Sequence, residues 1–132
     1  MDISIHDNSL LSYSVSAQKR EIRLHTIFLD GERSEYTDVV FSGVVAYHFE
    51  HDDFQTILFD IIEANLEDIH DEYEFLFSQG RSYHWPVDHD SRESLLRRMR
   101  EQEIRAFDIQ SSLGLSGWVW ARNMTKIRAD DR

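Results

Sequence analysis

The chain contains no cysteine, which excludes disulfide bonds, thiolate metal sites and cysteine nucleophiles. It has one proline and five glycines, and we find no segment with the composition of a linker or a low-complexity tract. No apolar run approaches the ~20 residues that a membrane-spanning helix needs. The first residues have neither a basic region nor an apolar core, so we expect no secretory signal. These absences predict one cytoplasmic domain that spans residues 1–132.

Basic residues are almost absent from one third of the chain. Residues 30–74 carry fourteen Asp and Glu side chains against a single base, Arg33, within a protein whose net charge is −11. A negative field of this size attracts a basic partner and repels nucleic acid and anionic membranes. We therefore expect a basic protein partner, no nucleic acid and no membrane.

The first half of the chain shows the period-two alternation that is typical of half-buried strands. Asp30-Gly31 is a turn signal between two of these strands. Gly43, in the middle of a longer run, indicates a bulge or a close backbone approach. The strands predicted here cover residues 11–16, 22–28, 36–49 and 56–62.

After Ile62 the apolar period changes to three and four residues, which predicts a helix over residues 66–79. A second helix is predicted over residues 91–103, with Asp90 as its N-cap and Glu93 as the capping-box partner. Strand character then returns over residues 104–109 and 115–122. The predicted fold class is α+β, with one mainly antiparallel sheet of about six strands and the two helices packed on one face.

The acidic side of the first predicted helix is the main candidate binding surface. Its like-charge pairs at i and i+4 each cost roughly 0.2–0.5 kcal/mol, and this segment contains no cation to relieve them. Two interpretations are open: a solvated helix face, or an interaction surface that tolerates repulsion for the sake of a partner. The candidate partner-binding residues are Glu67, Asp68, Asp71, Glu72, Glu74, Asp52 and Asp53, with Tyr83 and Trp85 as aromatic anchors.

Two segments that contain histidine, residues 48–53 and 84–90, are candidates for a metal site. Neither matches a zinc motif, and His48 and His51 have opposite parity on a strand, so their side chains diverge. We therefore expect no metal and no cofactor. The 80–90 loop combines aromatic and titratable groups, so it is where we expect a small-molecule pocket, if the protein has one.

Trp118 and Trp120 share one strand face. A core face beneath a helix is the favoured interpretation, and a stacking platform for a base or a sugar is the alternative. No nucleophile elbow, phosphate loop or dinucleotide fingerprint is present, so we expect no enzymatic activity. Two further alternatives stay open: a small-ligand or metal-binding protein that uses the 80–90 loop, and a structural domain that dimerises through an exposed sheet edge. The sequence leaves the oligomeric state undetermined.

Three segments carry a resemblance to a known group of proteins: HDNSLL at residues 6–11, VVFSGVV at residues 39–45 and ILFDI at residues 57–61. With the strand pattern between them, they resemble small uncharacterised bacterial proteins, some of which are immunity proteins of contact-dependent and polymorphic toxin systems. The resemblance covers about the first half of the chain and does not include the arginine-rich second helix. It implies a non-catalytic antitoxin of the cytoplasm that binds and blocks one toxin domain, with no active-site residues.

Overall fold

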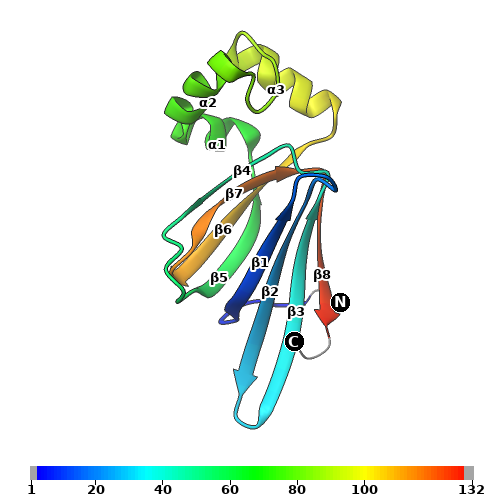
Figure 1. The fold of residues 1–132 in the computed structure, drawn as a ribbon, viewed down its shortest axis with the longest axis vertical. Coiled ribbons are helices and arrows are strands. Elements are labelled where there is room, and N and C mark those ends of the chain that lie inside the picture. The colour runs from blue at the N-terminus through cyan, green and yellow to red at the C-terminus, as the bar shows by residue number, and fades with distance from the viewer. Residues whose placement is uncertain (1–2, 130–132) are drawn as a thin grey trace.

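The computed structural model of the protein describes residues 3–129. Within them the chain has an α+β fold, with one antiparallel sheet of eight strands in the order β4-β7-β6-β5-β1-β2-β3-β8 and with three α-helices (Figure 1). The strands are β1 Ser9–Ser16, β2 Glu21–Asp30, β3 Arg33–Ser42, β4 Ala46–Glu50, β5 Ile57–Ala64, β6 Arg105–Leu113, β7 Ser116–Ala121 and β8 Asn123–Ala129; the helices are α1 Leu66–Glu72, α2 Glu74–Gly80 and α3 Arg92–Glu101, with a short 3-10 turn, η1, at Arg81–Tyr83.

The fold class is confirmed, but the sheet has eight strands where about six were predicted. The predicted strand 36–49 is two strands, because the chain leaves β3 at Gly43 and crosses to the opposite edge of the sheet. Gly43 has φ +64° at this crossing, and a Cβ there would lie 3.0 Å from the Arg122 side chain. The close approach predicted for this glycine is confirmed. The prediction of one continuous strand over residues 36–49 is wrong. The apolar alternation has the same parity before and after Gly43, so it gives no sign of the break.

The second additional strand is β8, which lies at the other edge of the sheet and pairs with β3 alone. Its side chains alternate between half-buried and exposed, and only Met124 packs against the core. An edge strand with lysine and arginine side chains has the composition that protects an open edge. The same composition hides the strand from a search for apolar alternation.

The sheet bends into two halves at the junction of β1 and β5, where the strands share only the pair Ser9–Ile57. The halves pack face to face, with the rings of Phe41 in β3 and Phe107 in β6 centred 5.7 Å apart. Among residues 3–129, this inner core contains thirteen buried apolar residues. They are Ile5, Ile22, Leu24, Val39, Phe41, Val44, Leu58, Ile61, Phe107, Ile109, Leu115, Val119 and Ala121.

The helices cover the outer face of β4, β7 and β6, and they gather at one end of the molecule, while the β2–β3 hairpin projects from the other (Figure 1). Successive strand residues point to opposite faces, so Val119 enters the inner core while Trp118 and Trp120 meet the helices. Both indoles are fully buried and stack with Phe77 of α2. The favoured interpretation of a tryptophan core beneath a helix is therefore confirmed.

The helical segment also differs in detail from the prediction. Residues 66–79 form two short helices, because the backbone of Tyr73 leaves the helical region at φ −111° and ψ 30°. Helix α3 is capped by Ser91, whose side chain accepts a hydrogen bond from the Ser94 amide and completes a capping box with it. The predicted cap at Asp90 is therefore wrong by one residue. Asp90 instead accepts a hydrogen bond from the Ser94 hydroxyl.

Candidate functional site

The outer face of the sheet continues beyond the helices and carries acids there. Across the strands, Ile62 of β5 pairs with Asp108 of β6, which pairs with Trp118 of β7, which pairs with His48 of β4. Paired residues share a face, so these four side chains form one row at the border of the helices. In the next row, Asp60 lies opposite Gln110 and Glu50 lies opposite Ser116. We call the surface formed by Glu50, Asp60 and Asp108, with Glu72 of α1 at its border, the acidic sheet face.

Tyr73 marks where the helices end on this face. Its ring centroid lies 5.4 Å from that of His48 and 5.9 Å from that of Trp118. Burial raises the pKa of the Tyr73 phenol, and the negative charges of Glu50, Glu72 and Asp108 raise it further. The negative charges of three carboxylates, which come from three different elements, therefore act on one half-buried phenol.

No lysine or arginine neutralises this surface within residues 3–129. The nearest partners of Glu50 are two histidines, with His48 Nε2 at 2.9 Å and His51 Nε2 at 3.6 Å. Asp60 accepts a hydrogen bond from the Ile61 amide, and Asp108 accepts one from the Gln110 side chain. The carboxylates of the acidic sheet face keep their charge available to an incoming cation.

The acids on the side of α1 that faces α3 are paired with arginines. Arg92 donates two hydrogen bonds to Asp71, at 2.8 and 3.0 Å, and holds the pKa of that carboxyl at about 2, with a smaller contribution from His70. Arg100 forms an ion pair with Glu67. The helical segment 66–79 contains no lysine or arginine, and α3 supplies the cations for these two residues from a distant part of the sequence. This pairing also gives the arginine-rich helix a structural role.

Two of the predicted partner-binding acids bond to neighbours on their own helices. Asp68 accepts a hydrogen bond from the Asn65 side chain at 3.3 Å, and Glu74 accepts one from the Ser78 hydroxyl at 2.9 Å. Glu72 is exposed at the border of the acidic sheet face. The structure therefore separates the predicted acidic helix face into a paired side and an open side, and Glu72 belongs to the open side.

Asp52 and Asp53 lie in the β4–β5 loop, which follows directly from Glu50. Asp52 accepts a hydrogen bond from the Tyr13 hydroxyl at 2.8 Å, and Asp53 accepts one from the Gln55 amide at 3.2 Å. Between them and β5 stands Phe54, which is fully exposed and has φ +71°. A bulky side chain in the left-handed region is uncommon, so the exposure of this ring is held at a conformational cost.

The two predicted anchors differ in exposure. Tyr83 is 64% exposed on η1. Trp85 is half-buried, because its ring stacks on Phe77 with centroids 5.1 Å apart. The anchor roles stay predictions, but Trp85 offers a partner less free surface than Phe54 does.

The histidine segments form pairs with carboxylates. His84 Nδ1 lies 3.0 Å from Asp88 Oδ1, and His48 pairs with Glu50 as described above. In the part of the chain that the structure describes, no group of three or more His, Cys, Asp or Glu side chains converges as a metal site would require. The absence of a metal and of a cofactor stays a prediction.

Sequence reasoning missed Asp108. Asp108 lies in a predicted strand far from the acidic segment, and only the pairing of β6 with β5 and β7 places it beside Ile62 and Trp118. The local signal that marks Asp108 is the parity of its strand, which becomes useful only when the strand order is known.

Comparisons of the chain with protein-family models, with curated proteins and with solved structures found no match. Among the described residues, no helix is long and apolar enough to cross a membrane.

Proposed function

We propose that this protein is a non-catalytic, immunity-type binding protein of the cytoplasm whose acidic sheet face docks on a basic surface of a toxin domain. One observation carries the proposal: Glu50 and Asp108 lie on one face of the sheet with Glu72 at its border, and within residues 3–129 no arginine or lysine is paired to them. The resemblance of the first half of the chain to immunity proteins supplies the class of partner.

The surface has the parts that a specific interface needs. The carboxylates attract arginine and lysine side chains and speed the encounter. Ile62 is 41% exposed beside Asp108 and offers apolar contact, and the Tyr73 ring can accept a cation against its face. Phe54 provides a large exposed ring near Asp52 and Asp53, as an anchor in an apolar pocket of the partner would require.

The proposal is tested with two double variants that remove the same charges from different places. Glu50→Gln/Asp108→Asn neutralises the acidic sheet face, and Glu67→Gln/Asp71→Asn neutralises the side paired with α3. The partner to use is the product of the neighbouring open reading frame, purified as an inactive variant, with association rates measured at low and at high salt. We expect the first variant to associate about three- to tenfold more slowly at low salt and the second within about twofold of wild type.

The growth of cells that express the active neighbour gives the functional readout. Wild type should restore growth, and Glu50→Gln/Asp108→Asn should restore less of it. Equal slowing of association by both variants would mean that only the net charge of the protein matters, and it would contradict a specific role of the acidic sheet face. A neighbour that does not bind would contradict the immunity role.

A further inference from the structure

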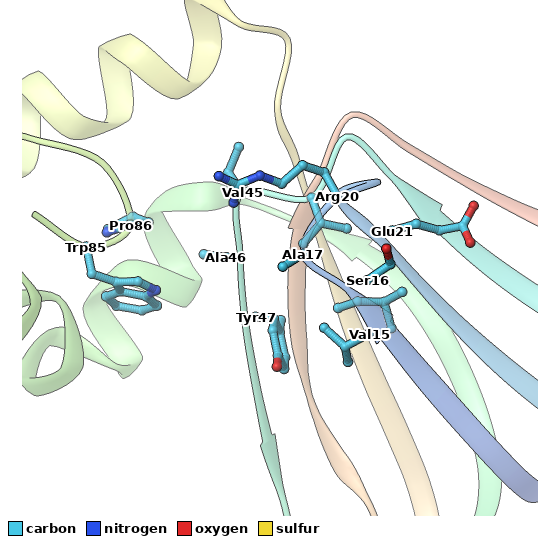
Figure 2. A pocket seen from close by; sticks show the side chains of 12 residues that line it. Val15, Ser16, Ala17, Arg20, Glu21, Val45, Ala46, Tyr47, Trp85 and Pro86 are labelled. Atoms are coloured by element: carbon cyan, nitrogen blue, oxygen red, sulfur yellow. The ribbon is translucent and has the colours of Figure 1, made fainter.

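Two adjoining clefts open where the β1–β2 turn, the β3–β4 connection and the loop at Trp85–Val87 meet (Figure 2). Their volumes are about 280 and 360 Å³, and they share Arg20, Val44, Val45 and Pro86. Small-molecule sites usually have volumes of roughly 300–1,000 Å³, so the pair together is large enough for a small ligand. We call the pair the Trp85 cleft.

The first part of this cleft is apolar. Val15 and Tyr47 are about two-fifths exposed at its rim, at 44% and 40%, and Trp85 forms the opposite wall. The Trp85 ring is fixed from behind, because it stacks on Phe77 and lies so close to Gly80 that a Cβ there would approach it to 2.6 Å. The wall is therefore formed by the fold before any ligand arrives, which lowers the entropy cost of binding.

The second part carries two arginines, Arg20 and Arg122. Arg20 has φ +53°, its carbonyl accepts the Val44 amide at 2.9 Å, and its side chain reaches across Val45 toward the cleft (Figure 2). The stem of Arg122 packs on Gly43. Within residues 3–129 neither guanidinium has a carboxylate partner, and Glu21, which also lines the cleft, lies 3.7 Å from Arg23 and points away (Figure 2).

Two arginines without a carboxylate partner thus lie beside an apolar cleft, in a protein of net charge −11. Guanidinium groups favour carboxylates, which they bind through paired N–H···O hydrogen bonds. We propose that the Trp85 cleft binds a small apolar carboxylate, with its hydrocarbon body between Val15, Tyr47 and Trp85 and its charged group at Arg20 and Arg122. This site is separate from the acidic sheet face and does not depend on the proposed function.

The test uses decanoate as the probe, with binding measured by calorimetry and by amide NMR shifts. The variants are Arg20→Asn, because asparagine tolerates a positive φ, and Arg122→Gln. Arg33→Gln, at the tip of the β2–β3 hairpin, removes one arginine far from the cleft and serves as the matched control. We expect saturable binding that shifts the amides of Val44–Tyr47, a loss of about tenfold in affinity for each cleft variant, and no change for the control. Affinity should rise by about fourfold for each methylene added between hexanoate and decanoate.

Decanol and decylamine share the hydrocarbon body and lack the carboxylate, so both should bind at least about tenfold more weakly. Equal binding of either one, unchanged affinity in both cleft variants, or shifts confined to other parts of the sheet would overturn the proposal. A short apolar peptide with a free C-terminus that binds more tightly than decanoate, and loses that binding on amidation, would also overturn it in favour of a peptide ligand.

Discussion

One face of strands β5, β6, β7 and β4 serves two purposes along its length. Where the helices cover it, the face is dry and aromatic, with Trp118 and Trp120 fully buried against Phe77. Beyond the helices, the same strands present Glu50, Asp60 and Asp108. The parity that points a side chain outward is the same in both places. Coverage by the helices, rather than the strand pattern, decides whether an outward position belongs to the core or to the surface.

The largest effect is expected in the covered part. Phe77 stacks on four rings, those of His70, Trp85, Trp118 and Trp120, and is 1% exposed. Phe77→Ala should lower the free energy of unfolding by about 3–5 kcal/mol, because it leaves a cavity between helix and sheet. Urea denaturation followed by tryptophan fluorescence measures this change. Phe75→Ala, two residues away and 58% exposed in the wild type, should stay within about 0.5 kcal/mol; equal losses would mean that the two rings are equally exposed.

A smaller effect, on the pH dependence of stability, is expected for the acids that pair with α3, in contrast to those of the acidic sheet face. The native pKa of Asp71 is about 2, below its ordinary 3.8, so the ionised form stabilises the folded state. This stabilisation is fully present above the unfolded pKa and is lost as the pH falls through about 2. The stability difference between wild type and Asp71→Asn should therefore be constant at neutral pH and shrink between about pH 4 and pH 2. Denaturation curves over a pH series test this. When both proteins also carry Arg92→Gln, the shrinkage should fall to the smaller part that His70 causes.

The smallest effect concerns Tyr73 at the border between the two parts. Burial is the main cause of its raised pKa, and Glu50, Glu72 and Asp108 add to it. Glu50→Gln/Asp108→Asn should therefore lower the pKa of Tyr73 toward 10 without reaching it. An NMR titration of ring-labelled tyrosine measures the shift. Tyr13 is an internal reference, because its own pKa is raised mainly by its hydrogen bond to Asp52. An unchanged pKa of Tyr73 would show that the charges of Glu50 and Asp108 do not act on its phenol.

The local patterns that the sequence displays were sufficient for the fold class but not for the site. The change of period after Ile62 predicted helices at nearly the right residues, because that signal lies within one segment. The cations that pair with Asp71 and Glu67 come from α3, and Asp108 shares a sheet face with Glu50 only because of the order β4-β7-β6. Such contacts depend on non-local strand pairing, which alternation of apolar residues does not specify.

The break at Gly43 also sets an order of events for the newly made chain. β3 pairs with β2, which precedes it directly, so this hairpin can close as soon as both strands have left the ribosome. β4 follows within a few residues, yet its sheet partner is β7, which is synthesised near the end of the described chain. Until then Tyr47 and Phe49 belong to a strand without a neighbour, and α1, α2 and α3 have no Trp118 and Trp120 to pack against. The inner core and the core between the helices and the sheet therefore form only when the last third of the chain has been made. An early stop in translation leaves an unpaired aromatic strand that can aggregate.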